Sequence, residues 1–151
     1  MFIMPDLTIR PIVARDRPAW EPLWAGYLSF YERKIAADVT DFTWKRLTTD
    51  GGISGLLAIA PGGNAVGFVH FLFHPTTWSN TDACYLEDLF VAPDARGQRV
   101  GRRLIAAVTA VASEKGATSV YWQTEEFNAT ARRLYERVAK RSPFIRYQID
   151  L

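Results

Sequence analysis

The sequence predicts one domain of the α/β (α+β) class that spans residues 1–151. Short runs rich in branched and aromatic residues, typical of strands, alternate with longer segments whose apolar residues recur every three or four positions, as on a helix face. The resulting order is β-α-α-β-β-β-α-β-α-β. A chain of 151 residues can bury one sizeable core, and no repeat or linker divides it.

Six segments are predicted to be strands. Pro11 favours an edge position for the first strand, because proline cannot donate a hydrogen bond to a neighbouring strand. The second and third strands are joined by Pro61-Gly62-Gly63-Asn64, whose turn chemistry predicts a hairpin. Pro93 ends the fourth strand. The predicted strands cover residues 7–13, 56–60, 65–73, 83–91, 119–124 and 143–149.

Four segments are predicted to be helices. Asp16 and Pro18 indicate the start of the first helix, with a carboxylate at the N-cap and a proline in the first turn. One broad apolar face of this helix contains Trp20, Leu23, Trp24, Tyr27, Leu28 and Tyr31. The other three helices begin at Asp38 or Thr40, at Val100, and at Asn128 or Thr130, and they extend to Asp50, Lys115 and Val138.

The composition is that of an ordinary globular chain. Eighteen basic and sixteen acidic residues give a net charge of +2, which is too balanced to indicate nucleic acid as the main partner. No window approaches eighteen apolar residues, so we expect no membrane span. The single cysteine, Cys84, fits a reducing compartment, and no signal peptide is expected at the N-terminus. A cytoplasmic location is therefore predicted.

The stretch Tyr85–Leu104 joins a strand, a glycine-containing loop and a helix start. N–H groups in the first turn of a helix lack intrahelical partners, so such a junction binds anions. Glu87 and Asp88 lie on the strand that leads into it. The stretch contains neither G-x-x-x-x-G-K-[ST] nor a G-x-G-x-x-G after a strand, which argues against a P-loop NTPase or a Rossmann dehydrogenase. An anion site beside paired carboxylates indicates function.

Metal-ligand residue types occur close together at His70, His74 and Cys84. Their spacing matches neither a zinc ribbon nor an H-E-x-x-H helix, so we expect no metal site. His74 is expected to shape a substrate pocket or to cap the loop before Pro75. Cys84 is expected to be buried as a small apolar side chain.

The chain resembles the GNAT N-acetyltransferase superfamily. The likeness lies in the strand ending at Val91, in the turn Arg96-x-x-x-x-Gly101, and in Asn128-x-x-Ala131-x-x-x-Tyr135 on the penultimate helix. The motif Tyr85–Val91 is similar to the branch that holds spermidine/spermine, thialysine and yeast histone/D-amino-acid acetyltransferases. This resemblance covers residues 7–151 and implies a GNAT fold.

The resemblance implies acetyl-CoA as co-substrate. Arg99 stands where the family usually has a glycine, and a positive φ there costs arginine on the order of 1 kcal/mol. Arg102 or Arg103 either meets a CoA phosphate or belongs to a solvated basic turn. The residues implied in cofactor binding are Leu89, Phe90, Val91, Arg96, Gly97, Gln98, Arg99, Val100, Gly101, Arg102, Asn128 and Tyr135.

The resemblance also implies catalytic roles. Tyr135 resembles the general acid, because a phenol with a pKa of about 10 stays protonated at neutral pH and can protonate a thiolate. Adjacent strand residues point to opposite faces, so Glu87 is assigned as base by its parity with Leu89 and Val91, while Asp88 binds a cationic substrate or holds a loop. The alternatives are a core tyrosine and a structural acidic pair.

The predicted function is direct transfer of acetyl from acetyl-CoA to the primary amine of a small molecule. Aromatic faces beside carboxylates suit ammonium groups, and the candidate substrate contacts are Trp24, Tyr27, Tyr31, His74, Glu87 and Asp88. The alternatives are an acetyltransferase for protein lysines or N-termini, and a non-catalytic acyl-CoA sensor. The last predicted strand offers an edge for a homodimer.

Overall fold

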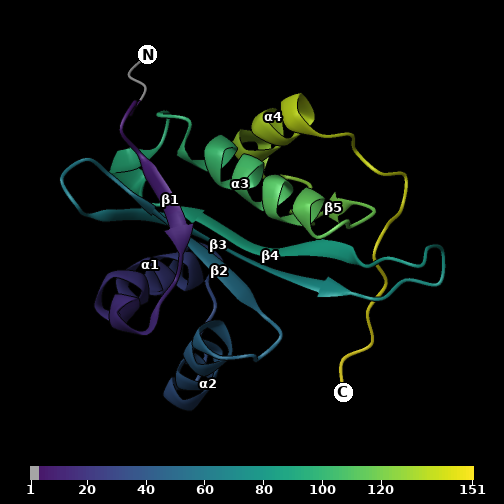
Figure 1. Ribbon diagram of the computed structural model, residues 1–151, viewed down its shortest axis with the longest axis horizontal. Helices are drawn as coiled ribbons and strands as arrows, with labels where there is room; N and C mark the ends of the chain where they lie inside the picture. The colour runs from purple at the N-terminus through teal and green to yellow at the C-terminus, as the bar shows by residue number, and fades with distance from the viewer. Residues whose placement is uncertain (1–3) are drawn as a thin grey trace.

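The computed structural model describes residues 4–151 and has at its centre one five-stranded sheet with the strand order β1-β2-β3-β4-β5 (Figure 1). Strands β1 to β4 pair antiparallel, whereas β5 pairs parallel with β4. This mixed, mostly antiparallel sheet confirms the predicted fold class, and Pro11 lies on an edge strand as expected. The strands are β1 (Thr8–Pro11), β2 (Ser54–Ile59), β3 (Ala65–His74), β4 (Ala83–Val91) and β5 (Val120–Tyr121).

Helices cover both faces of the sheet (Figure 1). They are α1 (Arg17–Phe30) and α2 (Ala37–Thr48) on one face, and α3 (Val100–Glu114) and α4 (Ala129–Val138) on the other, with two 3-10 turns at Ala14–Asp16 and Pro93–Ala95. Among the described residues, no helix combines the length and the apolar character that crossing a membrane requires.

Alternation along β2 and β3 divides the core into two layers. Leu57 and Phe68 pack with Trp20 of α1 and Trp44 of α2, while their neighbours on the other face pack with Leu104 of α3. Adjacent strand residues point to opposite faces, so a run of consecutive apolar residues supplies both layers. The predicted hairpin between β2 and β3 is confirmed.

A β-bulge interrupts β4 at the predicted carboxylate pair. His70 lies opposite Asp88 and Phe71 lies opposite Leu86, which leaves Glu87 as the extra residue of β4. Leu86 therefore packs in the α3 layer, whereas Phe90 packs in the α1 layer. Regular alternation would have placed both on one face.

The bulge overturns the parity argument for Glu87 and Asp88. Glu87 alternates with Leu86 before the bulge, and Asp88 shares its face with Phe90 after it, so both carboxylates lie on the α1 face of the sheet. The extra residue reverses the two-residue period, which the sequence pattern does not reveal.

Asp16 differs from its predicted role as an N-cap. It precedes α1, but its carboxylate accepts two hydrogen bonds from Arg10 at 2.7 and 2.8 Å and one from the Val13 N–H at 2.8 Å. The guanidinium of Arg10 is the main cause of the lowered pKa of Asp16. This ion pair joins the end of β1 to the start of α1. Because the Asp16 carboxylate is bound to Arg10, it does not cap the first N–H groups of the helix.

The predicted strand over residues 143–149 is wrong for the described chain. Residues 139–151 follow α4 as an irregular segment that ends apart from the helices (Figure 1). Phe144, Ile145, Tyr147 and Ile149 are 75–88% exposed. A strand needs a neighbouring strand whose backbone groups pair with its own. The edge strand β5 contains only Val120 and Tyr121, so the sheet offers residues 143–149 too short an edge for pairing.

Candidate active site

The carboxylates of β4 lie beside aromatic residues of α1. The Tyr27 hydroxyl donates to Asp88 Oδ1 at 2.6 Å, and the other oxygen of Asp88 lies 2.9 Å from His70 Nδ1. Burial, and then the charge of Asp88, raises the pKa of Tyr27. Tyr31, one turn further on, packs 4.9 Å from the Tyr27 ring. The Asp88 side chain is only 14% exposed, so its charge faces a partly dehydrated site.

Glu87 lies in a different environment. Its side chain reaches solvent. Partial burial and the charge of Asp88 raise the pKa of Glu87, whereas the charge of Arg146 lowers it by a smaller amount. Burial is the main cause of the raised pKa values of Tyr85 and Tyr121, and the charge of Glu87 raises both further. A carboxylate of raised pKa that remains accessible is suited to accept a proton.

Tyr135 comes from α4, on the far side of β4 from α1. Its ring meets Trp122 edge-on at 5.4 Å, and burial, with a smaller effect of Tyr31, raises its pKa to about 12. The phenol is therefore fully protonated at neutral pH, as a proton donor must be.

A cavity of about 830 Å³ borders Tyr135 between β5, α4 and the C-terminal segment. Trp122, Phe144 and Tyr147 contribute aromatic surface to it, while Glu87 and Asp88 lie outside its lining. The cavity therefore opens on the acid side of the site rather than on the carboxylate side.

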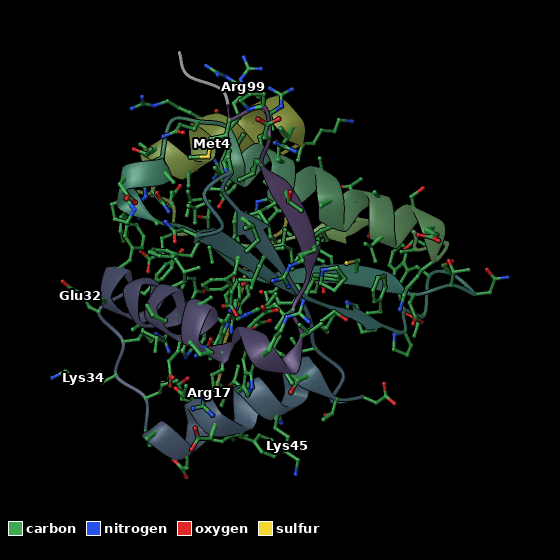
Figure 2. The ribbon with its side chains drawn as sticks, turned by 60° about the vertical axis from the view of Figure 1, so that its left-hand side comes forward. Met4, Arg17, Glu32, Lys34, Lys45 and Arg99 are labelled. Carbon is green, nitrogen blue, oxygen red and sulfur yellow. The ribbon has the colours of Figure 1, made fainter. Side chains whose placement is uncertain are left out.

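The loop before α3 has the backbone of an anion cradle. Gly97 has φ 78°, and Arg99 adopts the left-handed conformation with φ 63° and ψ 17° at the N-cap. An arginine side chain contains no acceptor, so it leaves the N–H groups of the first turn available to a ligand. Figure 2 shows Arg99 at the outer surface of the molecule.

The arginines around this loop have different partners. Arg96 Nε donates to the Val91 carbonyl at 3.1 Å, and its guanidinium lies 5.7 Å from the Phe90 ring. Arg103 donates to the Met4 and Leu7 carbonyls at 3.1 and 2.7 Å, which gives it a structural role. Arg102 is exposed at the same helix start. Of the two arginines expected near a phosphate, Arg102 is the one left for it.

The backbone positions predicted for the cofactor surround this loop. Leu89 and Val91 pack toward the α3 layer, whereas Phe90 is buried against α1. A Cβ on Gly101 would lie 3.4 Å from Leu134, so the start of α3 lies against α4. Asn128 caps α4 by accepting from the Ala131 N–H at 3.4 Å. The cofactor roles of these residues, with Gln98 and Val100, stay predictions.

The remaining predicted contacts fall into two groups. His74 Nδ1 lies 2.8 Å from the Pro75 carbonyl and its Nε2 lies 2.6 Å from the Tyr121 hydroxyl, so His74 links the end of β3 to β5, and its role at a substrate stays a prediction. Trp24 is buried and stacks on Trp20 and Tyr27 at 5.6 and 5.3 Å. Trp24 thus packs behind Tyr27, the aromatic residue of α1 that contacts Asp88.

His70 is the residue of this site that sequence reasoning missed, because we considered it only as a metal ligand. It is 1% exposed and faces Asp88, while Cys84 is buried with its pKa raised by that burial. The available signal was one histidine inside the apolar run Phe68–Phe73, since a buried polar side chain requires a partner.

Fold and site together define an acyltransferase: residues 17–139 match the acetyltransferase (GNAT) family, and the chain belongs to it as an acetyl-CoA-dependent N-acetyltransferase. It is 34% identical over 144 residues to D-amino-acid N-acetyltransferase HPA3 of Saccharomyces cerevisiae, covering 94% of this chain and 89% of the yeast protein.

Two further proteins show the breadth of the similarity. Thialysine N-epsilon-acetyltransferase of Bos taurus is 35% identical over 71 residues, which cover 47% of this chain and 41% of the bovine protein. The crystal structure of a ribosomal-protein-alanine N-acetyltransferase from Brucella melitensis biovar Abortus 2308 superimposes with a TM-score of 0.83 at 27% identity, covering 96% of this chain and 99% of that one.

Proposed function

We propose that the chain moves an acetyl group from acetyl-CoA directly to the primary amine of a small molecule. The observation that carries this is the approach of paired carboxylates on β4 to aromatic residues of α1, with a protonated Tyr135 across the strand. Carboxylates beside aromatic faces suit an ammonium group. The yeast and bovine relatives are named for D-amino acids and thialysine, which are small amines.

Glu87 serves as the base, directly or through water. An alkylamine with a pKa of about 10.4 is almost fully protonated at pH 7, so it must lose a proton before it attacks a carbonyl carbon. The raised pKa of Glu87 improves its match to this task. Asp88, which already accepts hydrogen bonds on both oxygens, holds the ammonium group instead.

Tyr135 serves as the acid for the leaving thiolate, and its raised pKa keeps the proton in place until that charge develops. The backbone beside Leu89, next to the bulge, supplies a hydrogen bond to the oxygen that becomes negative during attack. Donors fixed before the reaction need no reorganisation as charge appears, which makes such donors effective.

The chain contains a donor set that fits acetyl-CoA. When bound, this co-substrate supplies a thioester whose acyl carbon accepts the amine. The first-turn N–H groups of α3 and the loop from Arg96 to Arg102 suit its pyrophosphate, because no side chain caps the start of this helix. The strand from Leu89 to Val91 leads from the carboxylates to this loop and suits the pantetheine arm.

An amine panel incubated with acetyl-CoA and read by mass spectrometry tests this function. The panel contains polyamines, D- and L-amino acids, thialysine, an aminoglycoside and a lysine peptide. We expect an acetylated product from a small amine, and a rate about 10²- to 10⁴-fold lower for Tyr135→Phe, the usual contribution of a general acid. An unchanged rate in Tyr135→Phe would exclude Tyr135 as the acid.

The panel also separates the competing functions. Acetylation of the peptide alone would favour a protein acetyltransferase, in line with the similarity to the ribosomal-protein-alanine enzyme structure. If calorimetry detects acetyl-CoA binding but no amine is acetylated, the chain is an acyl-CoA sensor. The nearly balanced charge supports a small molecule, rather than a nucleic acid or membrane, as partner.

We also propose a homodimer that forms in the cytoplasm through the C-terminal segment. Ile145, Tyr147 and Ile149 alternate with Arg146 and Gln148, the pattern of a strand with one apolar face, and this apolar face is exposed. A segment with this pattern forms a strand once another sheet offers an edge to pair with. Because the segment also borders the cavity at Tyr135, a second copy would lie close to the acid.

A further inference from the structure

His70 links the candidate active site to the core. It lies on β3 between apolar neighbours, and both ring nitrogens have partners: Trp20 Nε1 at 3.0 Å from Nε2, and Asp88 Oδ2 at 2.9 Å from Nδ1. Trp20 is 0% exposed and His70 is 1% exposed. Because both residues are buried and their ring nitrogens are hydrogen-bonded, breaking this pair is costly and its geometry is rigid.

The chemistry of the partners decides where the proton of His70 lies. An indole N–H only donates, so Nε2 of His70 must carry a lone pair. Nδ1 therefore carries the hydrogen and donates it to Asp88, which makes the ring neutral and fixes its tautomer. The hydroxyl of Tyr27 donates to the second oxygen of Asp88.

These contacts form a chain of donors that ends at Asp88, which we call the Trp20–His70–Asp88 relay. Both carboxylate oxygens are held from the protein side, by α1 and by β3, and the remaining edge of Asp88 faces the site. Within residues 4–151, Glu87 receives no side-chain hydrogen bond, although it is the next residue on the strand. One carboxylate is fixed and the other is free to rotate.

We propose that Trp20 and His70 are positioning residues for acetyl transfer, which hold Asp88 as a fixed carboxylate for the substrate ammonium and thereby leave Glu87 as the proton acceptor. This inference rests on the proposed amine acetylation. Carboxylates that accept hydrogen bonds in their charged form are poor proton acceptors, because a proton would have to displace a donor. The relay thus divides the work of two adjacent acids.

The charged and titratable groups around the relay fit this division. Tyr27 and Tyr31 face Asp88 from α1, Glu87 faces it from β4, and Arg146 of the C-terminal segment faces Glu87. The positive charge of Arg146 thus acts on the freer carboxylate, Glu87. The fixed charge of Asp88 is left for the substrate.

Nuclear magnetic resonance of the imidazole nitrogens tests the tautomer without any substrate. The chain contains only His70 and His74, so a His74 variant assigns both signals. We expect His70 to be neutral and protonated on Nδ1. A His70 ring that carries a proton on Nε2 would overturn the proposal.

Two substitutions of His70 separate positioning from packing. His70→Asn retains an N–H near the position of Nδ1, whereas His70→Gln reaches toward Trp20 and loses the donor to Asp88. We expect His70→Gln to raise KM for the amine about 10- to 100-fold, since a charged hydrogen bond is lost. His70→Asn should keep most of the wild-type affinity for the amine. Equal losses in both variants, matched by equal losses of thermal stability, would reduce His70 to a structural residue.

A pair of tryptophan variants provides the matched control. Trp44 packs 4.9 Å from Trp20 in the same core layer. Trp20→Phe should remove the donor that fixes the His70 tautomer and raise KM for the amine about 3- to 10-fold, while Trp44→Phe should change KM less than twofold at a similar loss of stability. If the two variants raise KM equally, the indole N–H of Trp20 has no positioning role. A wild-type chain that acetylates no amine would instead refute the proposed function and leave the tautomer result standing.

Discussion

Glu87 and Asp88 differ in what surrounds them, although they are neighbours in sequence. Asp88 is held by Tyr27 and His70, while Glu87 reaches solvent and has a raised pKa. The difference comes from the bulge, which turns both side chains to the α1 face but leaves only Asp88 opposite a residue of β3. At the scale of single residues, the backbone register therefore decides which acid is held by hydrogen bonds and which one reaches solvent.

The pH dependence of the reaction is predicted to report Glu87. A base must be deprotonated, so kcat/KM should rise with pH through the pKa of Glu87, and this acid limb should lie above the ordinary glutamate value because burial and Asp88 raise that pKa. Glu87→Gln should remove the limb and lower kcat/KM about 10²- to 10⁴-fold. Steady-state kinetics between pH 4 and 9 measure both.

Asp88→Asn is the control for this profile. Because Asp88 is assigned to binding, its substitution should raise KM for the amine and shift the acid limb of Glu87 to lower pH, since a neighbouring negative charge is lost. A limb that persists in Glu87→Gln but disappears in Asp88→Asn would reverse the two assignments.

The loop that opens α3 shows how an element can keep its function with an unfavourable residue. Arg99 adopts φ 63°, a conformation that costs a non-glycine residue about 1–2 kcal/mol. The cradle depends on backbone N–H groups, so the side chain at this position does not determine its shape. Arginine has no acceptor to cap the helix and adds positive charge where we propose that the pyrophosphate binds.

Substitutions of Arg99 test the left-handed backbone. Arg99→Gly should change the free energy of unfolding by less than about 1 kcal/mol, because relief of strain is offset by the greater freedom of glycine in the unfolded chain. Arg99→Val should cost about 1–3 kcal/mol, since a branched residue fits this conformation poorly. Urea unfolding measures both values. If Arg99→Val matched the wild type, the loop would adopt another backbone in solution.

At the scale of the whole molecule, an apolar surface is exposed at the C-terminal end of the chain. Ile145 and Tyr147 are exposed at the cavity that Tyr135 borders, and Ile149 is exposed further along the same segment. Contiguous apolar surface of this kind usually marks an interface. Trp78 is also exposed, but it lies in the loop before β4 and provides an independent comparison.

Oligomeric state measured by light scattering tests this surface. We expect the chain to elute as a dimer, and the double variant Ile145→Lys with Tyr147→Lys to elute as a monomer, because two buried charges oppose association. Trp78→Lys should remain dimeric. A monomeric wild type at tens of micromolar, or a dimer that the double variant leaves intact, would contradict the proposed interface.

The local sequence was sufficient for the order of the elements as far as α4 and for the class of reaction. Turn residues placed the hairpin, Pro93 and the change of apolar period placed the junction of β4 with α3, and the apolar period after Asn128 placed the helix that contains Tyr135. These features depend on residues close together in the chain, whose preferences can be read directly.

The tertiary structure alone decided which side chains meet. The bulge at Glu87, the partner of Asp16 and the link from Trp20 through His70 to Asp88 join residues up to 50 positions apart. The missing strand at the C-terminus likewise depends on whether an edge is available, not on the alternation of residues 144–151. Register and pairing are set by packing across the whole sheet, so a local pattern cannot specify them.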